Sequence, residues 1–128
     1  MDKIVSKLIP CLEREKISYK HHGSRVRIPL PCNFGELEVA DLGQSDTILE
    51  LVDGDWHSHA DVLRYYGGDT PEEAIVCFLK RLFAGDFYLV ELRKDGKTTR
   101  KYIHEDRDKE SILRYLEPGE EAVIFNDT

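Results

Sequence analysis

The segment DGDWHSHAD, residues 53–61, places a polar side chain at every second position. These side chains are Asp53, Asp55, His57, His59 and Asp61. Imidazole and carboxylate groups are common protein ligands of zinc and other divalent ions. In an extended strand, successive side chains point to opposite faces, so all five would line one face and Trp56 would lie on the other. The segment is therefore either a row of metal ligands or a solvated surface.

The spacing of the segment limits how many of its side chains can bind one ion. Neighbours at i and i+2 on a strand stand about 6–7 Å apart, so only two or three can converge. Asp55, His57 and His59 are the candidate ligands of zinc or another divalent metal, in a metal-binding protein or a metal-dependent hydrolase. The reading we favour is an edge strand without any cofactor, whose charges discourage pairing with other chains and whose Trp56 anchors the dry side.

One part of the segment is similar to a known zinc motif. The tetrapeptide WHSH, residues 56–59, resembles the His-x-His element of the JAMM/MPN metalloproteases. In that family a proline follows the second histidine, and a serine and an aspartate come further on. Ala60, Gly67 and Thr70 stand at those places here, with Asp69 one position early. The third ligand and the serine are thus missing, which argues against a zinc peptidase.

Charge is spread unevenly along the chain, whose net charge is −7. Residues 34–77 carry one basic side chain, Arg64, against eleven acidic ones, a net charge of −10. Such a segment repels a phosphate backbone and attracts cationic partners. A small basic patch surrounds His21 and His22, but Tyr19 is its one aromatic residue. We therefore expect a basic protein partner and no nucleic acid.

Length and composition favour one globular domain, residues 1–128. The three cysteines, Cys11, Cys32 and Cys77, show no CxxC spacing and suggest a reducing compartment. No segment approaches the roughly 20 apolar residues of a membrane span. We expect a cytoplasmic chain without membrane contact. Gly-x-Ser-x-Gly is absent and Cys77 lies among apolar residues, so we expect no catalytic residues; the oligomeric state is left open.

Hydrophobic periodicity predicts the secondary structure. In chain order we expect a helix at 2–16 that Pro10 kinks or divides, strands at 24–30, 36–40 and 47–52, a short strand or the approach to a helix before Ala60, a helix at about 70–84, a hairpin at 87–103, and a short helix and a last strand near the C-terminus. Thr70, Pro71 and Glu73 start the central helix, and Gly85 ends it. The order predicts an α+β domain whose mostly antiparallel sheet packs against that central helix, with N-terminal and C-terminal helices.

The small size, the acidity and the lack of a catalytic set resemble the immunity proteins of bacterial polymorphic-toxin systems. The motif-like part of this resemblance is DGDWHSHADVL followed by the TPEEAI helix. It implies a non-enzymatic binding module whose acidic face mimics or blocks a cationic site on a partner protein. The contact residues that we expect are Glu36, Glu38, Asp53, Asp55, Trp56, His57, His59, Asp61 and Tyr65.

Overall fold

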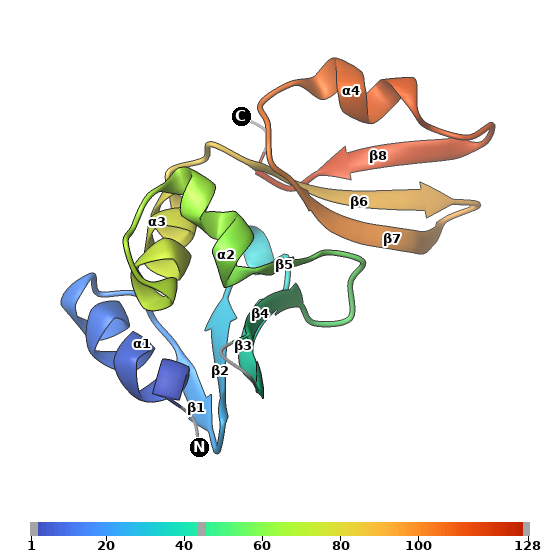
Figure 1. Cartoon of the computed structure of the whole chain (residues 1–128). Coiled ribbons are helices and arrows are strands. Elements are labelled where there is room, and N and C mark those ends of the chain that lie inside the picture. The colour runs from blue at the N-terminus through green and yellow to red at the C-terminus, as the bar shows by residue number, and fades with distance from the viewer. Residues whose placement is uncertain (1–2, 44–45, 127–128) are drawn as a thin grey trace.

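The computed structural model describes residues 3–43 and 46–126. Its strands form two antiparallel sheets and its helices lie against them, which confirms the predicted α+β class (Figure 1). In chain order the elements are α1 (Lys3–Arg14), β1 (Lys20–His22), β2 (Arg25–Pro29), the 3₁₀ turn η1 (Pro31–Asn33), β3 (Glu36–Gly43), β4 (Asp46–Leu51), β5 (His57–His59), α2 (Ala60–Leu63), the 3₁₀ turn η2 (Arg64–Tyr66), α3 (Pro71–Phe83), β6 (Tyr88–Lys94), β7 (Lys97–His104), α4 (Lys109–Arg114) and β8 (Glu120–Ile124).

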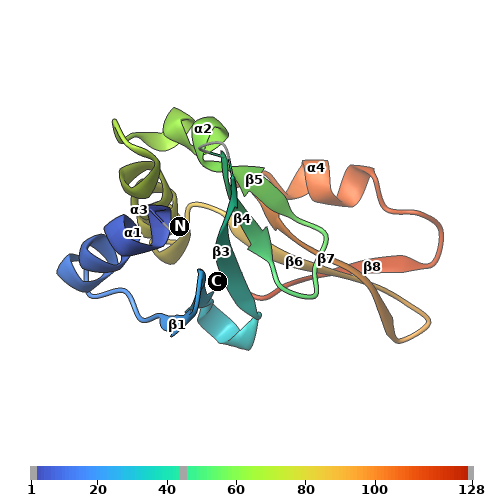
Figure 2. The same ribbon diagram turned by 60° about the horizontal axis from the view of Figure 1, so that its bottom comes forward.

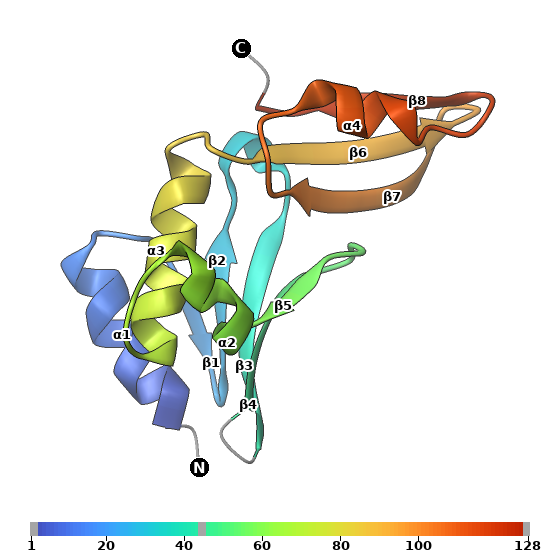
Figure 3. The same cartoon turned by 45° about the horizontal axis from the view of Figure 1, so that its top comes forward.

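Sheet A contains β1 to β5, and its strand order follows the chain. Period-two alternation aligns Val26, Val39 and Leu49 in one fully buried row across β2, β3 and β4. Helices α1 and α3 cover this face (Figure 3). Strand β1 was not predicted: the expected elements leave residues 17–23, which include His21 and His22, without a strand. All of β1 is exposed, so it carries no alternation of apolar residues that a sequence pattern would reveal.

Sheet B contains β7, β6 and β8 in that order. Its hairpin turns at Asp95 and Gly96, whose φ angles of 55° and 77° are those of the turn predicted from Asp-Gly. Helix α4 lies across one face (Figure 2), where Ile112 packs with Tyr88 and Val90 in a second apolar cluster. The sequence pattern located these strands but not their separation from sheet A, because alternation along a strand does not identify its neighbours.

The central helix α3 begins and ends where the sequence indicates. The Thr70 hydroxyl accepts a hydrogen bond from the Glu73 backbone N–H at 3.3 Å, Pro71 opens the helix, and Gly85 follows it with a φ of 85°. The Glu73 carboxylate accepts from the Asp69 N–H at 3.4 Å rather than from Thr70, one residue earlier than in a standard capping box. The predicted N-cap, first turn and C-terminal glycine are thus confirmed.

Helix α1 corresponds to the predicted helix 2–16, whose position 2 lies outside the described residues. Pro10 does not divide it, and the helix continues to Arg14. Asp41 of β3 accepts a hydrogen bond from the Ile4 N–H at 3.4 Å, so a carboxylate stands at the N-terminal end of α1. This contact ties the start of the helix to β3, the middle strand of sheet A.

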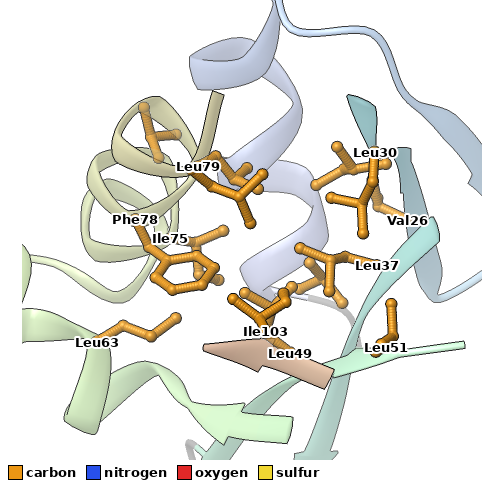
Figure 4. Packing of buried hydrophobic residues seen from close by; sticks show 14 of the residues in the cluster. Val26, Leu30, Leu37, Leu49, Leu51, Leu63, Ile75, Phe78, Leu79 and Ile103 are labelled. Carbon is orange, nitrogen blue, oxygen red and sulfur yellow. The ribbon is translucent and has the colours of Figure 1, made fainter. Parts of the chain in front are cut away.

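The main core lies between sheet A and helices α1 and α3 (Figure 4). Phe78 and Leu79 of α3 face Leu37 and Leu49 of the sheet, and Ile103 of β7 points into the same space. Sheet B thus contributes side chains to the main core as well as to its own cluster. No helix among the described residues is long and apolar enough to cross a membrane.

Candidate partner-binding surface

The 53–61 segment is not one continuous strand. Asp53 has a φ of 59° and lies in the turn after β4, β5 spans only three residues, and Asp61 lies in the first turn of α2. Its five polar side chains are therefore distributed over a turn, a strand and a helix. The expected single row does not form, because the turn at Asp53–Gly54 and the start of α2 at Ala60 interrupt the alternation.

Gly54 sets the position of this turn. A Cβ atom at Gly54 would stand 2.4 Å from Cδ2 of Leu51 and 3.0 Å from the Lys101 carbonyl oxygen. The next residue, Asp55, donates its backbone N–H to that same carbonyl at 2.7 Å. The turn between β4 and β5 is therefore held against β7, with the Asp55 side chain exposed.

The two histidines lie on the outer face of β5. Their ring centroids are 6.0 Å apart, and Nδ1 of His59 lies 2.9 Å from Oδ1 of Asp46. His57 is exposed, and Glu50 stands opposite it on β4. The described residues contain no group of three His, Cys, Asp or Glu side chains close enough to hold a metal ion. The structure therefore does not gather Asp55, His57 and His59 around a point.

Glu36 and Glu38, two of the expected contact residues, face cations of the same sheet. Glu38 is 5% exposed and pairs with Arg25 at 2.7 Å and Arg27 at 3.0 Å. Glu36 lies 3.5 Å from Lys20 and 3.7 Å from Arg27. Their charge is compensated within sheet A, so these two carboxylates add little to a field that a partner would sense.

Other carboxylates of the acidic segment have no such compensation. Glu50, Asp53, Asp55 and Asp61 are exposed, and within residues 3–43 and 46–126 none of their carboxylates has an ion pair or a side-chain hydrogen bond. Sequence reasoning included three of them and missed Glu50. Its place opposite His57 could have been inferred only with the β4–β5 register in hand.

Trp56 belongs to the core and not to the surface. It is 9% exposed, and its ring stacks on Phe78 with centroids 5.3 Å apart. The indole N–H donates to Glu105 at 3.1 Å, and the Tyr66 hydroxyl donates to the same carboxylate at 2.7 Å. Burial raises the pKa of Tyr66, and the hydrogen bond to Glu105 raises it further. The expectation that Trp56 meets a partner directly therefore does not agree with its burial.

Tyr65, by contrast, is 86% exposed. Its ring lies edge-on against that of Tyr66, with the ring centroids 5.2 Å apart. Val62, three residues earlier, is 64% exposed. The spacing places both on one face of the α2–η2 segment. Sequence reasoning missed Val62, although its i, i+3 relation to Tyr65 was available. We refer to these two residues and the four uncompensated carboxylates collectively as the acidic surface: Glu50, Asp53, Asp55, Asp61, Val62 and Tyr65.

A groove of about 690 Å³ lies elsewhere, between the ends of α1 and α3 and strand β2. None of the expected contact residues lines it. The residues of the acidic surface therefore do not line this groove. Their exposed position suits contact with a macromolecule better than enclosure of a small substrate. Comparisons with known protein families, with curated proteins and with solved structures found no match for this chain.

Proposed function

We propose that this protein is a non-catalytic binding module that engages a basic partner protein through the acidic surface, in the manner of an immunity protein. The observation that supports the proposal is that residues 50–65 carry four exposed carboxylates without internal counter-charges and two exposed apolar side chains. Aromatic anchors within a charged rim are typical of protein interfaces. The proposed module acts in the cytoplasm, needs no cofactor and binds no nucleic acid.

Binding through the acidic surface should depend on salt concentration. Uncompensated carboxylates attract a cationic protein over a Debye length, which shrinks from about 30 Å at 0.01 M salt to about 8 Å at 0.15 M. Complexes formed in this way associate faster and more tightly at low salt. Glu36 and Glu38 contribute little, since their arginine partners already neutralise them.

A pair of triple variants tests the proposal. Asp53→Asn/Asp55→Asn/Asp61→Asn removes three charges from the acidic surface, and Glu110→Gln/Glu117→Gln/Glu121→Gln removes three exposed charges from α4, the following loop and β8. Both variants have the same net charge. Proteins encoded by genes adjacent to the gene for this protein are purified. Each is titrated with the wild type and with both variants by calorimetry at low and physiological salt.

The proposal expects a basic neighbour that binds the wild type and the second triple variant and loses affinity for the first. Growth arrest caused by that neighbour should be relieved by co-expression of the wild type and not of the first variant. Equal loss in both variants would reduce the effect to net charge and would refute a specific surface. If no basic neighbour binds even at low salt, the proposed function is wrong.

A further inference from the structure

Strand β5 is an edge strand of sheet A. The direction in which each of its backbone N–H and C=O groups points can be assigned from its pairing with β4. The Leu51 N–H donates to the Trp56 carbonyl at 2.9 Å, which makes Leu51 and Trp56 a hydrogen-bonded pair. Ser58 stands opposite Leu49 in the same register and is the next such pair. His57 lies between these two pairs, so its backbone N–H and C=O groups point away from β4, toward the free edge. The N–H of His59 points the same way, whereas the His59 carbonyl belongs to α2, because His59 is the N-cap of that helix.

Asp55, the residue before His57 whose backbone N–H also points away from β4, is already bonded to another strand. Asp55 precedes His57 by two residues, and its N–H donates to the Lys101 carbonyl of β7 at 2.7 Å. Beyond this contact β7 turns toward the core, where Ile103 is buried and Glu105 bonds to Trp56. Among the described strands β5 pairs with β4 alone, and no further backbone hydrogen bond reaches the N–H or C=O of His57 or the N–H of His59. One backbone contact with another strand is therefore made at this edge, at Asp55, and the N–H and C=O of His57 and the N–H of His59 are open to a further strand.

The charges beside the edge select the kind of strand that it can accept. Glu50 lies opposite His57 on the outer face, and Asp55 and Asp61 flank β5 along the chain. A second copy of this chain, with a net charge of −7, would place like charges together at its own β5. An extended segment rich in lysine or arginine would pair its cations with these carboxylates while its backbone completes the rungs.

We propose that β5 receives an extended basic segment of the partner protein as a sixth strand of sheet A. The backbone of this segment bonds to His57 and His59, and its cationic side chains lie beside Glu50, Asp55 and Asp61. The inference rests on the proposed function and adds the mode of binding. It makes the backbone of β5, rather than the imidazole rings, the feature that recognises the partner.

A peptide pair separates strand pairing from charge. The probe is Lys-Val-Lys-Val-Lys-Val-Lys, and its control is the same peptide methylated at every backbone nitrogen. Both carry the same side-chain charge, but the methylated peptide cannot donate to a strand edge. At low salt we expect the methylated peptide to bind at least about tenfold more weakly, because it cannot donate to the His57 carbonyl and its N-methyl groups hinder close approach to the strand edge.

Two variants test the same point from the protein side. His59 is extended, with φ −96° and ψ 147°. His59→Pro removes the outward N–H, whereas His59→Ala removes the imidazole and its contact with Asp46 but keeps the N–H. We expect His59→Ala to bind the unmethylated peptide nearly as wild type does, and His59→Pro to lose affinity. Amide exchange at His57 and His59 in the wild type should slow when that peptide is bound, a readout that does not depend on the folding of His59→Pro.

The outcomes separate this inference from the proposed function. Equal binding of both peptides, or unchanged exchange at His57 and His59, would overturn strand addition and leave the acidic surface as a partner site. Failure of both peptides to bind overturns strand addition, and the triple variants then decide the proposed function independently. A dimer in the isolated wild type that His59→Pro dissociates would show that a second copy occupies the edge, and would overturn the inference.

Discussion

Glu105 shows how one side chain joins distant parts of this chain. It follows β7, yet its two carboxylate oxygens accept from Trp56, which is 49 residues away, and from Tyr66, which is 39 residues away. Trp56 and Tyr66 both contact Phe78 of the central helix. The polar ends of the buried Trp56 and the partly buried Tyr66 are thereby satisfied by one carboxylate, where an unpaired donor would be costly.

The ionisation of Tyr66 gives a prediction at this scale. Burial and the hydrogen bond to Glu105 raise its pKa above the ordinary value of 10.0. A pKa that is higher in the folded state contributes stability that is complete below pH 10 or so and is lost as pH rises toward the folded pKa. We expect the unfolding free energy of the wild type to fall between about pH 10 and pH 11.5 more steeply than that of Tyr66→Phe.

Denaturant titrations across this pH range check the prediction. Tyr19 and Tyr102 also have raised pKa values, both chiefly through burial, but they are present in both proteins and cancel in the comparison. Parallel pH curves for the wild type and Tyr66→Phe would show that Tyr66 does not contribute to the alkaline loss of stability.

The histidines of β5 give a second prediction. Because no three candidate ligands meet among the described residues, we expect neither a chelator nor added zinc to shift the melting temperature. His57→Ala should behave like the wild type in both conditions. The metal-binding alternative would be restored by two results: stoichiometric metal in the purified wild type, and a decrease of its melting temperature on addition of EDTA. Both should then be absent in His57→Ala.

At the scale of elements, the turn between β4 and β5 is set by packing. Ala at position 54 would bring its Cβ within 2.4 Å of the buried Leu51 side chain. We expect Gly54→Ala to lower the free energy of unfolding by about 1–3 kcal/mol and to displace Asp55. Denaturation of the single variants Gly54→Ala and Leu51→Ala and of the double variant measures this.

The double variant is the control for that assignment. If the clash with Leu51 is the cause, Leu51→Ala should relieve part of the cost of Gly54→Ala, and the two losses should be less than additive. Strict additivity would place the cost of Gly54→Ala elsewhere, for example at the Lys101 carbonyl oxygen, which lies 3.0 Å from the added Cβ.

The elements themselves differ in how far the sequence reveals them. Helix α3 was predictable because Thr70, Pro71 and Gly85 act locally, each within a turn of the residue that they affect. Strand β1 was not, since its exposed residues belong to a strand only through pairing with β2. The burial of Trp56 was equally hidden, because it depends on Phe78 and Glu105, which are distant in the sequence.

In the candidate surface, too, some features follow from the local sequence and others depend on contacts between distant residues. The exposure of Asp55, His57 and Tyr65 follows from their polarity or from their place beside a turn. The neutralisation of Glu38 does not, because Arg25 and Arg27 reach it across a strand pairing that only the fold defines. Charge counted along the sequence therefore overstates the part of the acidic segment that a partner would meet.

At the scale of the whole molecule, the shared core predicts cooperative unfolding. Phe87, Leu89 and Ile103 come from sheet B or its approach but belong to the main cluster. We therefore expect Trp56 fluorescence and far-ultraviolet circular dichroism to report one coincident transition, as the prediction of a single domain requires. Ile112→Ala, under α4, should lower stability by about 2–4 kcal/mol by both probes.

Leu113→Ala is the matched control, since this neighbouring side chain is 56% exposed and should change stability little. Two separated transitions, with the Ile112→Ala effect confined to the dichroism signal, would show that sheet B unfolds by itself. The single-domain prediction would then be wrong.

The strand order of sheet A also bears on how the protein is made. Each strand from β2 to β5 pairs with the strand that precedes it, so every pairing can form as soon as its second strand has left the ribosome. Strand β8 differs, because it must return past β7 and α4 to lie beside β6. A nascent chain can therefore pair the strands of sheet A in the order in which they are made, whereas sheet B is complete only after β8 has been synthesised.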